Sequence, residues 1–145
     1  MEYGSDEYFM KAALQEAHMA AAKGEIPVGA VIVGAGRIIA RTHNLTETLN
    51  DVTAHAEMQA ITCAAEAMGG KYLNDCTLYV TLEPCQMCAG ALYWAQISRV
   101  VWGADDLRRG YRAMGASLHP KTTTTSGILA GECQAIIDDF FKKLR

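Results

Sequence analysis

Residues 77–88 read TLYVTLEPCQMC, in which a short β-type run is followed by a proline and two cysteines. Thr77 to Thr81 predicts a strand, because β-branched and aromatic residues favour extended backbone. Pro84 is suited to the entry of a helix, which predicts a helix over Cys85 to Trp94. The segment therefore predicts a strand that leads directly into a helix.

The rest of the chain alternates in the same way. Gly34-Ala35-Gly36 separates two apolar runs and predicts a β-hairpin, and Gly69 closes an Ala-rich stretch that predicts a buried helix. The alternation predicts an α/β fold in three α/β/α layers, with a mixed sheet because a hairpin is antiparallel. We expect strands over 28–33, 37–41, 77–81 and 100–102, and helices over 6–23, 54–68, 85–94 and 128–144.

The composition predicts one globular domain over residues 1–145, with 50% hydrophobic and 20% charged positions. No apolar run approaches the roughly 18 residues that span a membrane, and the acidic first ten residues do not resemble a signal peptide. Five cysteines are an odd number, which favours a reducing compartment and a cytoplasmic location. Cys63, Cys76 and Cys133 are expected to be packing residues, and Trp94 and Trp102 core or subunit-interface anchors.

The charges are distributed unevenly along the chain. Residues 1–98 hold 5 Lys/Arg and 11 Asp/Glu, whereas residues 99–145 hold 8 Lys/Arg and 5 Asp/Glu. The net charge of -3 argues against a protein that coats nucleic acid, but the C-terminal third could present a local basic face.

Two strand-to-helix junctions carry metal-binding residues. Cys85 and Cys88, three positions apart in the first turn of a helix, can point at one metal ion, and the helix N-terminus favours their thiolate forms. His55 supplies a third ligand, so that a tetrahedral Zn²⁺ keeps one open position. Open coordination suits catalysis, because zinc lowers the pKa of bound water to roughly 7. Glu57, two residues after His55, can take the proton of that water and pass it to a leaving amine.

This ordered set, His-x-Glu followed by Pro-Cys-x-x-Cys, matches the signature of zinc nucleobase deaminases. Four segments resemble bacterial tRNA adenosine deaminases more closely: EIPVGAV (25–31), TAHAE (53–57), TLYVTLEPC (77–85) and MCAGA (87–91). The similarity extends from Tyr8 to Cys133. It implies a cytidine-deaminase-like fold with about five strands, a homodimer, and conversion of wobble adenosine to inosine in the anticodon loop of an arginine tRNA.

The resemblance also implies roles for individual residues. His55, Cys85 and Cys88 would hold one Zn²⁺ per subunit, and Glu57 would be the proton shuttle. Asn44 would hydrogen-bond the flipped adenine, and Asp106 would approach the nucleotide sugar. The pocket wall would include Ile26, Val28, Ala56 and Leu82.

The chain is shorter between Gly110 and Gly127 than the commonest form of the family, so tRNA contacts there cannot be transferred residue by residue. We expect the basic residues of the C-terminal third to meet tRNA phosphates, the alternative being a solvated loop and a frayed helix end. These residues are Arg108, Arg109, Arg112, Lys121, Lys142, Lys143 and Arg145.

Three other functions remain possible from the sequence. A guanine or cytosine free-base or nucleoside deaminase would suit the acidic overall charge, and a Tyr93-Trp94-Ala95 run also occurs in guanine deaminases. A catalytically silent subunit of another deaminase would lack the glutamate, so Glu57 counts against it. Glu57 likewise counts against a purely structural zinc site.

Overall fold

Five strands form one sheet in the computed structural model, which describes residues 1–144. The strands β1 (Gly29–Gly34), β2 (Arg37–His43), β3 (Cys76–Leu82), β4 (Arg99–Ala104) and β5 (Thr123–Thr125) lie in the order β2-β1-β3-β4-β5. β1 pairs antiparallel with β2 and β3, whereas β3, β4 and β5 run parallel. The sheet is therefore mixed, as predicted.

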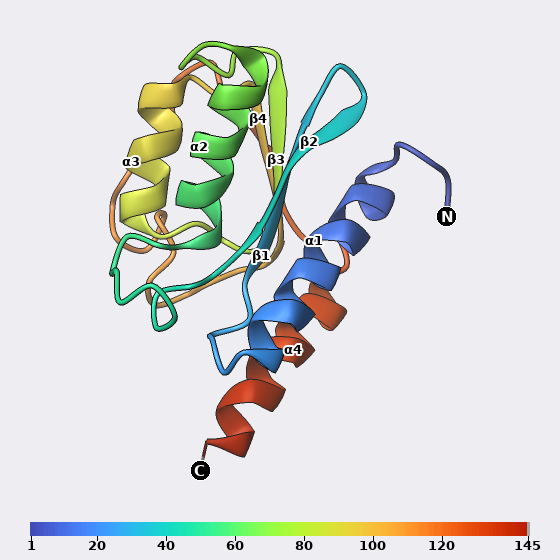
Figure 1. The fold of residues 1–145 in the computed structure, drawn as a ribbon, viewed down its shortest axis with the longest axis vertical. Helices are drawn as coiled ribbons and strands as arrows, with labels where there is room; N and C mark the ends of the chain where they lie inside the picture. The colour runs from blue at the N-terminus through green and yellow to red at the C-terminus, as the bar shows by residue number, and fades with distance from the viewer. Residues whose placement is uncertain (145) are drawn as a thin grey trace.

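Helices cover both faces of this sheet (Figure 1). α2 (Ala56–Met68) and α3 (Gln86–Ala95) lie on one face, and α1 (Asp6–Ala22) and α4 (Ala130–Lys143) lie on the other. Alternate side chains of the strands enter two cores: Leu78 and Val80 pack under α2 and α3, while Tyr79 packs with α1 and α4. The structure confirms the three-layer α/β/α fold.

Local sequence features set the ends of these elements. The hairpin turns at Ala35 and Gly36, whose φ angles of 53° and 76° are those a tight two-residue turn between twisted strands requires. Ser5 caps α1 by accepting a hydrogen bond from the Tyr8 N–H, and Gly69 ends α2 with φ 74°. The predicted helices and strands are present with ends shifted by one or two residues.

The structure adds to these expectations and corrects one of them. About five strands were expected, but β5 was not located, because the four threonines at 122–125 give no periodic signal. α2 is not buried on most faces: only Ala56, Glu57, Ala60 and Ala64 are buried, so Cys63 is exposed on its outer side and does not pack in a core. Of the two roles predicted for the tryptophans, Trp102, which is 2% exposed, has the core role, whereas Trp94 is 77% exposed, which leaves the subunit interface as its predicted role.

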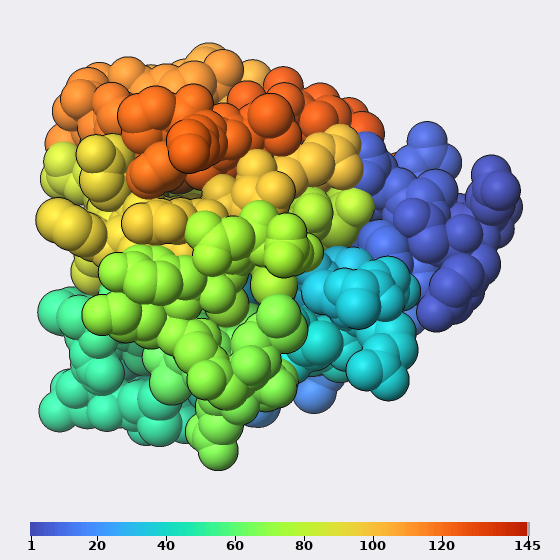
Figure 2. Space-filling model, turned by 90° about the horizontal axis from the view of Figure 1, so that it is seen from above, coloured from blue at the N-terminus to red at the C-terminus, as the bar shows by residue number. Residues whose placement is uncertain are grey.

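The long segment between β4 and α4 spreads over the side of the molecule next to α3, shown in orange beside yellow in Figure 2. Its His119 ring lies 5.4 Å from the ring of Tyr93 on α3. Among residues 1–144, no helix has the length and apolar character needed to cross a membrane.

Candidate active site

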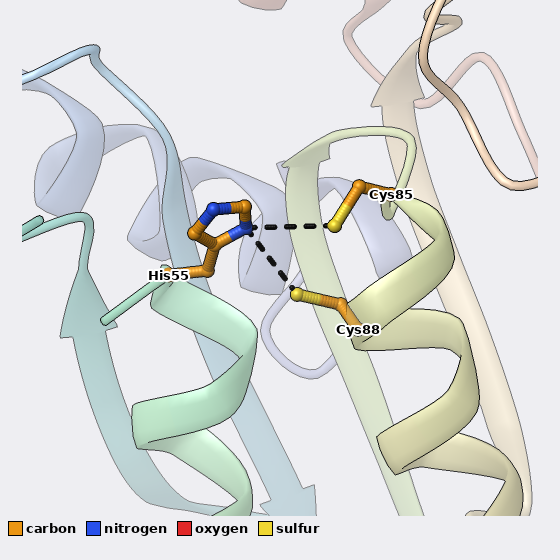
Figure 3. Close-up of side chains that lie close together, drawn as sticks. All are labelled: His55, Cys85 and Cys88. Carbon is orange, nitrogen blue, oxygen red and sulfur yellow. Dashed lines mark hydrogen bonds between the residues drawn. The ribbon is translucent and has the colours of Figure 1, made fainter. Parts of the chain in front are cut away.

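The N-termini of two helices bring three metal-binding side chains together. His55 is the N-cap residue of α2, Cys85 is the N-cap residue of α3, and Cys88 lies in the first turn of α3. Both sulfurs face the same ring nitrogen (Figure 3): His55 Nδ1 lies 3.6 Å from Cys85 Sγ and 3.5 Å from Cys88 Sγ. The three donor atoms all lie within 4.8 Å of one another.

These distances fit a zinc ion. Zn–S bonds of about 2.3 Å and Zn–N bonds of about 2.0 Å at tetrahedral angles place sulfur and nitrogen ligands about 3.6 Å apart. One nitrogen and two sulfur donors also match the preference of zinc, and three protein ligands leave one position open. The cluster of His55, Cys85 and Cys88 is thus positioned to bind zinc with a free coordination site.

The pKa values of the two cysteines are shifted in opposite directions. A hydrogen bond from the Cys88 thiol is the main cause that lowers the pKa of Cys85 to about 4, and His55 adds to it. The pKa of Cys88 is raised, first by that hydrogen bond and then by burial. A thiolate is the form that ligates zinc, so the lowered pKa of Cys85 favours metal binding, and zinc binding would release the proton that Cys88 holds.

Glu57 is a buried carboxyl group beside this cluster. It occupies the first turn of α2, two residues after His55, and is 4% exposed. Burial raises the pKa of Glu57 to about 7. A carboxyl group with this pKa can both accept and release a proton near neutral pH, as a general acid–base requires.

The cluster opens into a cleft of about 800 Å³. The six side chains predicted from the resemblance to contact substrate all line it, together with Arg108, Arg109 and the metal-binding residues His55 and Cys85. The structure thus brings residues 26–28, 44, 55–57, 82–85 and 105–109 into one site.

Asn44 is held at the cleft by its own amide group. Its Nδ2 donates to the Ile26 carbonyl at 3.2 Å, and its Oδ1 accepts the Thr46 N–H at 3.3 Å. The amide carries a second N–H and a second lone pair. Asn44 therefore keeps one donor and one acceptor for a ligand while its orientation is fixed.

The loop that follows Asn44 is held by Glu25, a buried carboxylate for which no role was predicted. Glu25 accepts hydrogen bonds from the Glu47 N–H at 3.0 Å and from the N–H and hydroxyl of Thr48, both at 2.6 Å. Burial raises the pKa of Glu25, but these donors outweigh it, so that the pKa lies below its ordinary value. Glu25 therefore remains charged and links Glu47 and Thr48 to the segment before β1.

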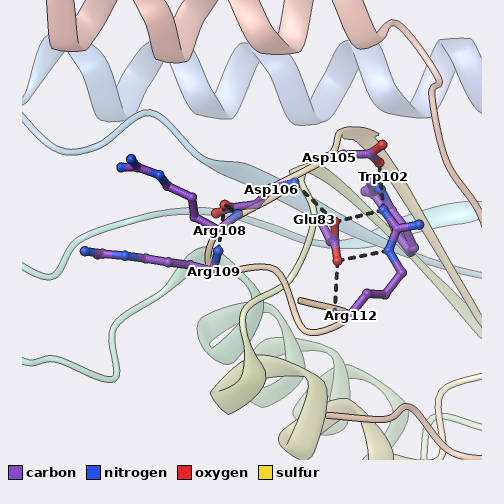
Figure 4. A network of polar contacts seen from close by, with 7 residues as sticks. All are labelled: Glu83, Trp102, Asp105, Asp106, Arg108, Arg109 and Arg112. Atoms are coloured by element: carbon purple, nitrogen blue, oxygen red, sulfur yellow. Dashed lines mark hydrogen bonds and ion pairs between the residues drawn. The ribbon is translucent and has the colours of Figure 1, made fainter. Parts of the chain in front are cut away.

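Residues 105–112, here called the rim segment, follow β4 and contribute to the cleft. Asp106 Oδ1 accepts the N–H groups of Arg108 and Arg109, at 3.2 and 2.9 Å, which folds the segment into a turn. The side chains of Arg108 and Arg109 extend away from this turn (Figure 4). Arg112 differs, because its guanidinium is paired with Glu83 at 3.0 Å and with Asp105 at 3.0 Å.

The sequence did not predict that α4 lines the cleft. Gln134, Ile137 and Phe141 of α4 line it along with Leu107 and Thr46. The spacing of Ile137 and Phe141 places them on one helix face, but that pattern equally describes core packing. Lys121, Lys142 and Lys143 are exposed and do not line the cleft, and the prediction for Arg145 lies outside the described residues.

Comparisons with known proteins agree with this geometry. The family model of the cytidine and deoxycytidylate deaminase zinc-binding region matches residues 4–104. The tRNA-specific adenosine deaminase of Bacillus subtilis (strain 168) is 45% identical over 97% of this chain and 91% of its own length. A solved structure from studies of A-to-I editing by tRNA:A34 deaminases at the wobble position of transfer RNA superposes with a TM-score of 0.81 and 44% identity. That superposition covers 89% of this chain and 98% of the other.

A guanine deaminase from Bacillus subtilis is also similar, at 41% identity over 79% of this chain and 69% of its own, with a TM-score of 0.66. The tRNA:A34 deaminase structure superposes more closely and over more of both chains. With its His-Cys-Cys zinc site and buried glutamate in place, the chain is a hydrolytic deaminase that belongs to the family of tRNA-specific adenosine deaminases.

Proposed function

We propose that this protein deaminates the wobble adenosine of a tRNA anticodon loop to inosine, with an arginine tRNA as substrate. The observation that carries the proposal is the placement of the buried Glu57 carboxyl group beside the three zinc-binding side chains, in the same cleft as the Asn44 amide. Hydrolytic deamination needs these groups together: a metal site, a proton carrier and a group that reads the base edge.

His55, Cys85 and Cys88 would hold the zinc. Zinc bound there supplies a Lewis acid that makes water a competent nucleophile at neutral pH. Glu57 takes a proton from the attacking water and delivers it to the departing amine, so that water and adenosine give inosine and ammonia. The same carboxyl group can take up the proton and release it again, because its pKa is about 7.

The cleft walls orient the base and sugar. Ile26, Val28, Ala56 and Leu82 give the adenine an apolar surface, on which a base swung out of a loop stacks. Asn44 offers its remaining donor and acceptor to the base edge. Asp106 uses Oδ1 for the rim turn, and no hydrogen bond within residues 1–144 engages its Oδ2, which is available to a sugar hydroxyl.

A tRNA substrate is supported by the cations at and near the cleft. Arg108 and Arg109 line it and extend their guanidinium groups outward, as contacts with loop phosphates require. Lys142 and Lys143 are exposed at the end of α4, whose Phe141 lines the cleft. Lys121 and Arg145 belong to the same basic third of the sequence and are proposed as peripheral phosphate contacts.

We extend the proposal to the protein's organisation. Residues 1–145 form one zinc-dependent deaminase domain that works as a homodimer in the cytoplasm. The 77% exposed indole of Trp94 and its neighbour Tyr93 on α3 support a subunit contact at that helix, since a large exposed aromatic surface is typical of interfaces.

The test is a deamination panel with purified, zinc-loaded protein. The substrates are an arginine tRNA with a wobble adenosine, free adenosine, guanine and cytidine. We expect inosine in the tRNA alone, and ammonia release from none of the small substrates. Turnover of guanine without turnover of the tRNA would overturn the proposal in favour of a free-base deaminase.

The role of Glu57 is tested in the same panel. Glu57→Gln preserves the side-chain shape but cannot carry the proton, so we expect turnover to fall by about 10³-fold with zinc content unchanged. Glu66→Gln on the exposed side of the same helix is the matched control and should retain full activity. Full activity in Glu57→Gln would contradict the mechanism.

A further inference from the structure

Glu83 is a buried carboxylate that the proposed mechanism does not use. It is 3% exposed and follows β3, two residues before Cys85. Four hydrogen bonds reach it from the rim segment (Figure 4): from the Asp106 N–H at 3.1 Å, the Arg112 N–H at 3.3 Å, and Arg112 Nε and Nη2 at 3.1 and 3.0 Å. Its two oxygens therefore bind both ends of the segment at once.

The guanidinium of Arg112 is held in place by further contacts. Its Nη2 lies 3.0 Å from Asp105 Oδ1, and that same oxygen accepts the Trp102 indole N–H at 2.8 Å. The guanidinium carbon lies 5.0 Å from the centre of the Trp102 ring, within the range of a cation–π contact. Arg112 thus has two carboxylates and an aromatic ring as partners, although half of its side chain is accessible to solvent.

The backbone joins the rim segment to the metal-binding turn itself. Gly110 forms an isolated antiparallel bridge with Cys85, and the Tyr111 N–H donates to the Pro84 carbonyl at 2.8 Å. A Cβ atom at Gly110 would collide with the Glu83 carboxylate and with the Asp106 carbonyl, so the close approach requires glycine. The position of the cleft rim is consequently tied to the position of a zinc ligand.

We infer that Arg112, acting through Glu83, is a positioning residue that fixes the rim segment against Cys85, and that it is not a phosphate contact. The inference rests on the proposed function, because it states how the substrate-facing residues 105–109 are held at a fixed place relative to the metal. The inference also gives the three arginines of the rim segment different roles. Arg108 and Arg109 contact the substrate, whereas Arg112 holds the segment on which they lie.

The first experiment separates positioning from phosphate binding. In Arg112→Ala, we expect kcat on the tRNA to fall by about 10- to 100-fold, because an error of about 1 Å in placement has an effect of this size. The Kd for an anticodon stem-loop, measured by fluorescence anisotropy across a salt series, should keep its wild-type salt dependence. A lost phosphate contact would instead raise KM and Kd and reduce the salt slope by about 0.7 to 1.

Two further variants calibrate this result. Arg109→Ala removes a neighbouring guanidinium that extends outward, and it should change Kd and the salt slope with little effect on kcat. Arg37→Ala removes an exposed cation on β2, outside the cleft, and should change neither.

A double-variant cycle shows whether Arg112 acts through Glu83. We expect Glu83→Gln to lower kcat, and Arg112→Ala to have little additional effect in that background, because the two side chains form one unit. Arg112→Lys, which keeps a charge near Glu83 but lacks the two-pronged geometry, should recover part of the lost kcat. Zinc content and circular dichroism, measured on each variant, identify any that fails to fold.

Two outcomes would overturn the inference: a shallower salt slope with unchanged kcat in Arg112→Ala, or additive effects of Glu83→Gln and Arg112→Ala. If the wild-type protein instead turns over guanine and not tRNA, the proposed function fails by itself. The effect of Arg112→Ala on kcat can then be measured with guanine, so the two failures are distinguishable.

Discussion

Two kinds of segment line the cleft. The metal junctions are residues 55–57 and 85–88, each at the start of a helix, and the rim segment is a loop. Each metal-binding residue is the N-cap residue of a helix or lies in its first turn, and Cys88 and Glu57 are almost fully buried. The rim segment is an irregular loop in which Leu107 is 84% exposed, and its shape depends on Glu83 and Arg112, 29 positions apart. Within each metal junction the side chains are thus placed by local spacing, although the two junctions lie 30 positions apart and meet only in the fold. The rim segment depends on distant contacts for its own shape as well.

This difference has a physical basis. A helix N-terminus fixes the directions of its first residues and favours thiolates and carboxylates through its backbone N–H groups. A loop has no such constraint, so its conformation depends on the hydrogen bonds it makes elsewhere. Changes at the metal junctions should therefore abolish the chemistry, whereas changes at the rim should alter rate or affinity by smaller factors.

Removal of the metal should have the largest effect. Treatment with a chelator is expected to lower tRNA deamination by about 10³-fold or more, because Glu57 alone is too weak a base to activate a water whose pKa no metal ion has lowered. Adding Zn²⁺ should restore activity in the wild type and not in Cys88→Ser. Activity that survives in protein shown by elemental analysis to be free of metal would contradict the role of the junctions.

Asn44 should give an intermediate effect. Asn44→Ala removes a fixed amide from the cleft and should lower kcat/KM by about 10- to 100-fold, the usual value of one or two hydrogen bonds to a bound ligand. Zinc content should stay at the wild-type level. Asn74→Ala, which changes an exposed asparagine bonded to Gln96, is the matched control. Unchanged kinetics in Asn44→Ala would remove Asn44 from base recognition.

The outward cations should give a smaller effect that depends on salt. Arg108→Ala is expected to raise KM for tRNA by about three- to tenfold and to reduce the salt slope of binding by about 0.7 to 1, as expected for one phosphate contact. Steady-state kinetics and anisotropy titrations at several salt concentrations measure both quantities. A KM that responds to Arg108→Ala equally at low and high salt would indicate a contact other than a phosphate.

The smallest effect is expected from an ion pair far from both regions. Asp6 in the first turn of α1 accepts hydrogen bonds from Arg99 at 2.8 Å and from the Tyr79 hydroxyl at 2.8 Å. Asp6→Asn should lower the free energy of unfolding at neutral pH by about 1 kcal/mol and leave kcat unchanged. Urea unfolding curves measure the first quantity.

The stabilisation by Asp6 should also depend on pH. Arg99, assisted by Tyr79, lowers the pKa of Asp6 below 3.8. A lowered pKa in the folded state stabilises the protein above the pKa of the unfolded state, about 3.9, and this contribution is lost as the pH falls through the folded-state value. The wild type and Asp6→Asn should therefore converge in stability under acid conditions. A constant difference at all pH values would show that the charge of Asp6 is not the stabilising factor.

The sequence predicted the elements whose signals are local. The hairpin at Ala35-Gly36, the glycine end of α2 and the proline entry to α3 each depend on neighbouring residues, and the structure confirms them. β5 was missed because Thr123 to Thr125 becomes a strand only by pairing with β4. The exposure of Cys63 was missed because an Ala-rich helix does not show in its sequence which face packs on the sheet.

By itself the sequence determined the make-up of each metal junction: at a helix start, the spacing of His55 and Glu57, or of Cys85 and Cys88, leaves little freedom in where the side chains point. The packing of α2 and α3 on one face of the sheet then brings the two junctions together. The tertiary structure alone decided how the cleft is completed. It placed Gln134, Ile137 and Phe141 of α4 in the wall, and it paired the half-exposed Arg112 with Glu83 and Asp105. The reason is that the type of a side chain indicates from the sequence only whether it tends to be buried or exposed. Which residue it contacts is decided when distant segments pack together.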